Sequence, residues 1–369
     1  MTSALDLDAF RDPKLARELI ARIEHIVGDR HINLMEVCGT HTMSIGRYGF
    51  RSMLPRNLQL LSGPGCPVCV TANHDIDHAI ALARLDGLTV ATFGDMMRVP
   101  GSSSSLAEEK SAGHDIRIVY SPLDAIELAV KRPEREVVFL GIGFETTAPL
   151  IAASILAAEE RGLANFSVLC MHKTTPAALR AIASDPACAV DGFILPGHVS
   201  TITGAAPFRF LVDEFETPGV ITGFEPVDIL EGIALLVEMV TSGQPAIVNA
   251  YRRGVRDDGN PVARSLCERV FEHADATWRG LGPLPGSGLR IRDTFARFDA
   301  ARRFAVEVEP VSEPRGCRCG DVLRGVIAPT SCPLFARTCT PEHPVGPCMV
   351  SSEGSCAAHY RYRDWPRVK

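Results

Sequence analysis

The sequence lacks the features that would point to a nucleic acid or a membrane as the protein's partner. Its 38 lysines and arginines are outnumbered by 44 aspartates and glutamates, so a net charge of −6 gives no attraction to phosphate backbones or anionic lipids. The longest apolar stretches, such as residues 148–158, are far too short to span a bilayer. Residues 1–14 are acidic and contain no apolar run, so we expect no signal peptide and a cytoplasmic protein.

Several common cofactor-binding motifs are also missing. Gly141-x-Gly143 lacks the third glycine of a dinucleotide-binding fingerprint, and no stretch matches a phosphate-binding P-loop. The C-terminal cysteines contain neither the two CxxC pairs of a zinc ribbon nor the C-x2-C-x2-C run of a bacterial ferredoxin. The sequence therefore gives little support to nucleotide binding, and the cysteines have to be interpreted from their own spacing.

Cysteine itself is plentiful, with 12 in 369 residues. Structural disulfides are rare in the cytosol, so these cysteines need a metal, redox or catalytic explanation. Six are spread over the first 316 residues and six crowd into the last 53. Three of the first group, Cys170, Cys188 and Cys267, lie in strand-like or apolar segments, and we expect them to be core or neutral thiols.

The most distinctive stretch runs from Ser62 to Cys69 and reads Ser-Gly-Pro-Gly-Cys-Pro-Val-Cys. It follows an apolar run at 58–61 and precedes a helical pattern from about Ala72, which predicts a strand, a tight turn and a helix. Its glycines allow a sharp turn and its prolines restrict the backbone. A helix N-terminus and CxxC spacing both favour thiolate over thiol. We therefore expect Cys66 and Cys69 to be reactive; the alternative is a buried turn with two incidental cysteines.

Strand and helix patterns alternate along the chain up to residue 242. The predicted strands cover residues 32–37, 58–61, 88–93, 116–120, 137–140, 166–171, 192–195 and 220–221. Helical spacing between them predicts βαβ units and parallel sheets covered on both faces. We expect an α/β fold with an N-terminal helical segment (1–30), two Rossmann-like domains around a cleft (31–132 and 133–242) and a cysteine-rich C-terminal iron–sulfur domain (243–369).

Nearly every predicted strand-to-helix connection carries Gly, Thr, Ser, His or Cys. Ligands of α/β sheets bind at the carboxyl ends of the strands, so we expect these loops to converge on one cleft between the two domains. His41 and His198 would act there as acid, base or ligand, or else be solvated loop residues. Asp95 and Glu145 would hold those groups or move protons, with helix capping as the alternative.

Cys38, Cys66 and Cys69 form the first cysteine constellation. They lie on two adjacent predicted strand-to-helix loops, so their sulfurs can reach a common point. Soft thiolates suit a soft metal such as low-valent iron. Three sulfurs also allow two to bind a metal while the third takes part in a disulfide.

The second constellation lies in the C-terminal 53 residues and consists of Cys317, Cys319, Cys332, Cys339, Cys348 and Cys356. Six clustered cysteines suit an iron–sulfur cluster held by four thiolates, with two left for a redox-active disulfide beside it. The alternative is a zinc ion or a set of disulfides that staples a small, loop-rich domain. Spacing alone does not choose four ligands from six.

Five motifs resemble the signatures of the HypD family of [NiFe]-hydrogenase maturation factors. They are CGTHT (38–42), GPGCPVCVT (63–71), GFETTAP (143–149), PGHVS (196–200) and GPCMVSSEG (346–354). They occur in the family's order, and the similarity covers about residues 33–362, nearly the whole chain. The resemblance implies three α/β domains, with a [4Fe-4S] cluster in the last.

By this resemblance the chain is a scaffold for assembly of the Fe(CN)2CO group of [NiFe]-hydrogenases rather than a turnover enzyme. The implied partners are a small HypC-like chaperone that shares the iron, a HypE-like cyanide donor and the hydrogenase large-subunit precursor. Cys38 and Cys69 are the implied iron ligands, and Cys66 is implied to pair reversibly with Cys69.

The resemblance also divides the C-terminal cysteines into two groups. The implied cluster ligands are Cys317, Cys332, Cys339 and Cys356, and the implied redox disulfide joins Cys319 to Cys348. The same residues would serve a stand-alone iron–sulfur thiol–disulfide oxidoreductase, which is the alternative function. Cys38 separates the two hypotheses, because a simple dithiol reductase needs only the CxxC pair.

Overall fold

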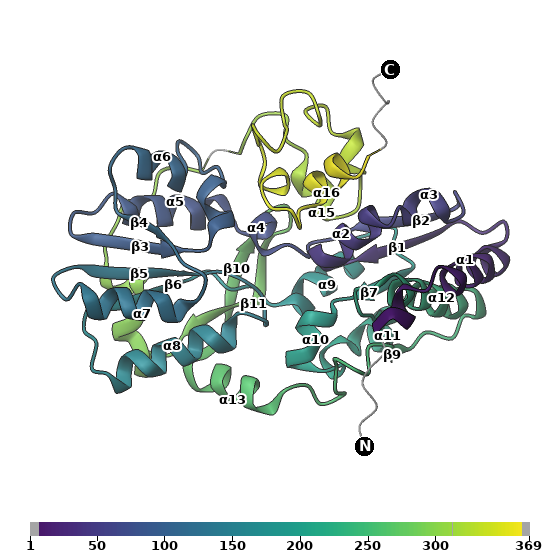
Figure 1. The fold of residues 1–369 in the computed structure, drawn as a ribbon, viewed down its shortest axis with the longest axis horizontal. Coiled ribbons are helices and arrows are strands. Elements are labelled where there is room, and N and C mark those ends of the chain that lie inside the picture. Colours follow the sequence, from purple (N-terminus) through teal and green to yellow (C-terminus); the bar gives the residue numbers. More distant parts are fainter. Residues whose placement is uncertain (1–6, 312, 364–369) are drawn as a thin grey trace.

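Two parallel β-sheets dominate the computed structural model, which describes residues 7–311 and 313–363 (Figure 1). The first sheet has the strand order β2-β1-β7-β8-β9 and the second β4-β3-β5-β6, and every pair is parallel. The strands of the first are β1 (Ile32–Glu36), β2 (Leu58–Ser62), β7 (Gly192–Leu195), β8 (Gly219–Ile221) and β9 (Ile247–Asn249). Those of the second are β3 (Leu88–Thr92), β4 (Ile116–Ile118), β5 (Glu136–Gly141) and β6 (Phe166–Cys170).

Helices cover both faces of each sheet, as the alternating pattern predicts. On the first sheet, α1 (Pro13–Val27) and α12 (Pro226–Ser242) pack together over one face, and α9 (Thr175–Ser184) and α11 (Phe210–Phe215) lie on the other. The second sheet lies between two further pairs, namely α7 (Pro122–Lys131) with α8 (Ala148–Glu160), and α5 (Asn73–Ala83) with α6 (Leu106–Ser111). Burial of the apolar residues on both faces of each sheet stabilises this layered arrangement.

The two sheets are not built from successive parts of the chain. The first takes strands from residues 32–62 and again from 192–249, whereas the second takes all of its strands from 88–170. The expected boundary at residue 132 therefore falls inside the second sheet, and β9, beyond the expected boundary at 242, belongs to the first. Alternating strand and helix patterns predict parallel strands, but which strands pair depends on packing between distant segments.

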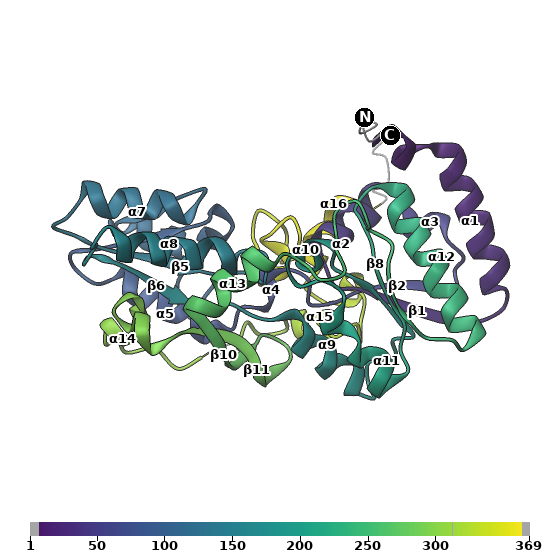
Figure 2. The ribbon, with the colours of Figure 1, turned by 90° about the horizontal axis from the view of Figure 1, so that it is seen from below.

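A long antiparallel hairpin connects the two sheets to the C-terminal lobe (Figure 2). It consists of β10 (Phe271–Trp278) and β11 (Gly282–Ile291), and it follows α13 (Pro261–Val270). In this region a strand pattern occurs only at 289–294, because the glycines and prolines of 280–288 are typical of a loop. Single bridges pair Trp278 with Thr71 and Gly288 with Lys173, so the hairpin contacts segments that follow strands of both sheets.

The C-terminal lobe, residues 315–363, contains little regular structure. Its α-helices are the short α15 (Cys319–Leu323) and α16 (Ser355–Arg361), and the lobe lies over the junction between the sheets (Figure 1). The smaller helices elsewhere are α2 (Gly39–Arg47), α3 (Phe50–Met53), α4 (Pro67–Val70), α10 (Gly197–Thr203) and α14 (Ala300–Arg303). No helix in the described ranges is long and apolar enough to cross a membrane. The predicted α/β class with two parallel sheets is confirmed, together with the cysteine-rich C-terminal part.

Candidate functional site

The loops that follow β1 and β2 bring Cys38 and Cys66 together through direct backbone contact. The N–H of Gly39 donates to the carbonyl oxygen of Gly65 at 3.1 Å. A Cβ atom at Gly65 would overlap the backbone of Cys38, so the close approach of the two loops requires glycine there. The residues after Cys38, predicted as a strand-to-helix loop, form the first turn of α2, and Cys66 lies immediately before α4.

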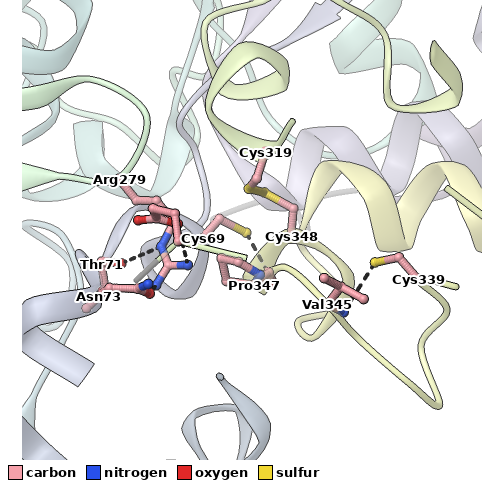
Figure 3. The surroundings of a disulfide bond; sticks show 10 residues. Cys69, Thr71, Asn73, Arg279, Cys319, Cys339, Val345, Pro347 and Cys348 are labelled. Atoms are coloured by element: carbon pink, nitrogen blue, oxygen red, sulfur yellow. Dashed lines mark hydrogen bonds and ion pairs between the residues drawn. A yellow bond between two sulfur atoms is a disulfide. The ribbon is translucent and has the colours of Figure 1, made fainter. Parts of the chain in front are cut away.

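Cys69 lies on α4 and faces the C-terminal lobe. Its side chain is fully buried, and its sulfur lies 4.0 Å from the carbonyl oxygen of Pro347. The next residue, Cys348, forms a disulfide with Cys319, which is the pair that the family resemblance implies (Figure 3). The structure therefore places the free thiol of Cys69 next to a disulfide of the C-terminal lobe.

Burial favours the protonated form of Cys38 and Cys69. It raises the pKa of Cys38 to about 12, with a further contribution from the nearby carboxylate of Glu353. Burial and then the neighbouring Cys66 raise the pKa of Cys69 well above its ordinary value. The thiolate expected for Cys69 is disfavoured in the metal-free chain, because α4 has only four residues and loss of hydration outweighs its dipole. A bound metal ion would displace these protons, since a coordinating thiol is deprotonated.

Two histidines stack on one phenylalanine at the same edge of the first sheet. The ring of Phe224 lies 4.8 Å from that of His41 and 4.0 Å from that of His198. Nε2 of His41 lies 2.9 Å from both the carbonyl oxygen of Gly223 and the hydroxyl of Thr222. Burial lowers the pKa of His41 to about 4, so its ring is neutral at pH 7. Nε2 faces a carbonyl and carries the proton, which leaves Nδ1 a lone pair without a hydrogen-bond partner in the described part of the chain.

The segment 346–354 of the C-terminal lobe ties both sheets to the cysteine site. The hydroxyl of Ser351 donates to Oδ2 of Asp95 at 2.9 Å, which links it to the loop after β3. The hydroxyl of Thr40 donates to Oε1 of Glu353 at 2.8 Å, which links it to α2. The sequence did not identify Glu353 as a site residue, although it lies within a recognised motif. Its signal would have been a carboxylate in a glycine- and cysteine-rich segment.

Glu145 lies outside this site. Its carboxylate accepts hydrogen bonds from the N–H (2.8 Å) and hydroxyl (3.0 Å) of Thr175, and so caps the N-terminus of α9. It lines a separate cavity of about 560 Å³ to which Cys38, Cys66 and Cys69 do not contribute. The structure thus favours the capping interpretation of this residue, although Glu145 caps a later helix than the one that follows it.

All six cysteines of the C-terminal lobe line one small cavity with apolar walls. The four that are free thiols are Cys317, Cys332, Cys339 and Cys356. Burial and the charges of the other three raise the pKa of Cys356. The N–H of Val345 donates to the sulfur of Cys339 at 3.4 Å, and a Cβ atom at Gly346 would lie 2.6 Å from the sulfur of Cys317.

This donor set fits an all-cysteine iron–sulfur cluster. Four thiols share an apolar pocket, one sulfur accepts a backbone N–H, and a glycine leaves room beside another. Within the described residues, no three His, Cys, Asp or Glu side chains gather as they would around a single metal ion.

The remaining cysteines are outside both constellations. Burial raises the pKa of Cys170 to about 12 and those of Cys188 and Cys267 to about 11. They are neutral thiols at pH 7, as the sequence predicted.

Comparison with known proteins agrees with the motifs. The model of the HypD family, described as "Hydrogenase formation hypA family", matches residues 14–363. The chain belongs to the HypD family. It is 48% identical to the hydrogenase maturation factor HypD of Cupriavidus necator over 98% of this chain and 99% of that protein. The HypD proteins of Rhizobium leguminosarum bv. viciae (46%; 96% and 95% covered) and Escherichia coli K12 (42%; 97% and 98% covered) are also similar. The expected family is confirmed, and with it a role in hydrogenase maturation.

Four of the five motifs that resemble HypD signatures meet at the cysteine site. CGTHT and GPGCPVCVT supply the thiols, PGHVS supplies His198, and GPCMVSSEG supplies Cys348 and Glu353. The fifth, GFETTAP, lies at the edge of the second sheet, where Phe144 stacks on Trp278 of the hairpin. This motif of the HypD family therefore supports the hairpin rather than the thiols.

Proposed function

We propose that this chain is the scaffold on which the iron of [NiFe]-hydrogenases receives its cyanide and carbon monoxide ligands, with Cys38 and Cys69 binding the iron. The observation that carries the proposal is the backbone contact between the two loops that bear Cys38, Cys66 and Cys69, with Cys69 against a disulfide-bearing lobe. Cyanide and carbon monoxide need back-donation from an electron-rich iron. Thiolates supply this electron density better than carboxylates do.

The chain's own sulfurs can exchange two electrons without an outside reactant. When Cys66 and Cys69 attack the Cys319–Cys348 disulfide, a Cys66–Cys69 disulfide forms and the other pair becomes two thiols; two electrons and two protons change places. The reverse reaction frees Cys69 for iron. The four remaining thiols of the lobe, those of Cys317, Cys332, Cys339 and Cys356, would hold a [4Fe-4S] cluster, which supplies single electrons when bound.

Two protein thiolates leave the remaining iron positions to ligands from outside the chain. A small HypC-like chaperone would provide one, a HypE-like protein would supply cyanide, and the large-subunit precursor would receive the finished group. His41 follows Cys38 on α2 and stacks, like His198, on Phe224; the Nδ1 lone pair of His41 can accept a hydrogen bond and orient a ligand.

Infrared spectroscopy of the chain isolated anaerobically with its chaperone tests this function. The native complex should absorb where metal-bound cyanide and carbon monoxide absorb. Cys38→Ala and Cys69→Ala should lack these bands and keep the brown colour of the C-terminal lobe. Cys188→Ala, which removes a thiol outside both constellations, is the matched control. If either cleft variant keeps the full set of bands, that cysteine is not a required ligand.

The second candidate function is a stand-alone iron–sulfur thiol–disulfide oxidoreductase. The observation that favours it is the dithiol of Cys66 and Cys69 beside the Cys319–Cys348 disulfide. The Cys38→Ala variant separates the two functions, because an oxidoreductase should still reduce a small disulfide substrate without Cys38. Retained reduction together with an absence of infrared bands in the native complex would favour the oxidoreductase.

A further inference from the structure

Arg279 is a buried arginine that binds the segment immediately after Cys69. It lies at the tip of the β10–β11 hairpin and is 5% exposed. Its backbone N–H donates to the carbonyl oxygen of Val70 at 2.8 Å, and its Nε donates to the carbonyl oxygen of Thr71 at 3.0 Å. Its Nη2 donates to Oδ1 of Asn73 (Figure 3). Three hydrogen bonds therefore fix the guanidinium and its backbone to residues 70–73.

The residue after Arg279 contacts the segment that carries the disulfide. A Cβ atom at Gly280 would overlap the Cα of Gly320, and the reverse also holds, so the two backbones touch. Gly320 follows Cys319 directly in the chain. The tip of the hairpin thus lies between the segment that follows Cys69 and the segment that follows Cys319, and Arg279 is fixed at that position.

The positive charge of Arg279 has no buried carboxylate bonded to it in the described residues. Nη1 lies 3.7 Å from Oε2 of Glu313, whose side chain is 59% exposed, and makes no hydrogen bond within the described ranges. Burial lowers the pKa of Arg279, and the negative charge of Glu313 and Asp77 opposes that effect; Cys317 and Cys69 would oppose it only as thiolates. The carboxylate of Asp77 already accepts hydrogen bonds from the N–H and hydroxyl of Ser102. The sulfurs of Cys69 and Cys317 are therefore the neighbours of Arg279 that can still gain a negative charge.

We propose that Arg279 is a positioning residue for the sulfur chemistry at Cys69, where its fixed charge stabilises the negative charge that appears on that sulfur. The inference rests on the proposed function, in which Cys69 alternates between a disulfide and a free thiol. Reduction adds two electrons to the Cys66–Cys69 bond, and one sulfur leaves as a thiolate before it takes up a proton. A better stabilised leaving thiolate departs faster. The same charge would stabilise an iron-bound thiolate with anionic cyanide ligands.

The test measures how fast a small dithiol reduces the Cys66–Cys69 disulfide in the full-length chain. The chain is first oxidised with glutathione disulfide, then treated with dithiothreitol, and alkylation with mass spectrometry of the peptide containing both cysteines follows the reaction. Arg279→Gln removes the charge and should slow reduction about tenfold. Arg279→Lys keeps the charge but loses the planar fork of donors, and should stay within about threefold of the native rate. Dithiothreitol supplies the two electrons and is itself oxidised to a cyclic disulfide.

Arg290→Gln is the matched control, because it removes the same charge from β11 of the same hairpin, where Arg290 pairs with Glu272. Its rate should equal the native one. The inference would be overturned if Arg279→Gln and Arg279→Lys slowed reduction equally, or if both variants were reduced faster than the native chain. It would also be overturned if the rate for Arg279→Gln lay within twofold of the native rate. Should Arg279→Gln not fold, Glu313→Gln provides the second measurement. Loss of this competing carboxylate should speed reduction about twofold, and an unchanged or slower rate would overturn the inference.

The outcomes also separate this inference from the function on which it rests. If the native chain forms no reducible Cys66–Cys69 disulfide, the redox part of the proposed function and the role of Arg279 fail together. If the native chain cycles normally and the Arg279 variants behave as the control does, the role of Arg279 alone fails.

Discussion

The two cysteine sites are supported in different ways. Cys38, Cys66 and Cys69 lie on loops that leave neighbouring strands of a parallel sheet, and backbone contact between those loops brings them together. The six cysteines of the C-terminal lobe lie on a segment with two short helices and irregular turns around a small cavity. The same side chain is therefore positioned by a regular sheet in one site and by a loop-rich lobe in the other.

This difference indicates what each site needs in order to keep its shape. The sheet buries a large apolar core on both faces, so the cleft should survive loss of a thiol. The lobe has few backbone hydrogen bonds in regular elements, so the disulfide and a bound cluster would supply much of its stability. Loss of a cysteine should therefore destabilise the C-terminal lobe more than it destabilises the first sheet.

The largest expected effect is loss of the cluster and partial unfolding of the lobe in Cys332→Ala. Anaerobically purified native chain should contain about four irons and four sulfides, as an all-cysteine [4Fe-4S] cluster requires. The variant should lose most of both, and limited proteolysis should cut within 315–363. Cys38→Ala should keep the cluster and resist cleavage. Zinc in place of iron in the native protein would contradict the cluster.

Acid should weaken the cleft through His41 by roughly 3 kcal/mol. The pKa of this buried ring is lowered from 6.5 to about 4, so it contributes stability above pH 6.5 that is lost as the pH falls to 4. His41→Gln cannot take up that proton and should lose less stability over this range. Denaturant unfolding at several pH values measures the difference, with His343→Gln, on an exposed turn of the lobe, as control. Parallel stability curves for the native chain and His41→Gln would refute the assignment.

Gly65→Ala should break the contact between the two cleft loops at a cost of about 2 kcal/mol. The added methyl group would overlap the backbone of Cys38, so one loop has to move and the infrared bands of the iron ligands should weaken. Gly94→Ala is the matched control, because its Cβ would meet only Ile118 at an ordinary 3.7 Å. Full bands in Gly65→Ala would show that the positions of the thiols do not depend on this contact.

The smallest effect is expected for Glu145→Gln, at about 1 kcal/mol. The amide keeps one of the two hydrogen bonds to Thr175 but loses the charge at the N-terminus of α9. The infrared bands should be unchanged, since Glu145 lines a different cavity from the thiols. Loss of the bands at normal stability would instead place Glu145 in the iron chemistry.

Local patterns in the sequence were sufficient to predict most elements and to select the candidate cysteines. The strands β1 to β8 lie within a few residues of the predicted ranges, because alternating apolar runs and polar loops report burial directly. The cysteines of both sites were selected by spacing and by the family motifs. Most of the hairpin was not predicted, because its glycines and prolines are typical of loops. Its two strands are neighbours in the sequence, but they pack against segments that are distant in the chain.

Only the tertiary structure decided which strands pair, how the thiols are protonated and which charged residues lie beside them. Cys69 looked like a thiolate from its position at a helix start, yet burial under the C-terminal lobe outweighs that effect. Glu145 and Asp95 looked equivalent in the sequence, but one caps a helix and the other binds the lobe. Strand pairing, desolvation and the placement of Arg279 all depend on contacts between residues far apart in the chain, and a local pattern does not contain that information.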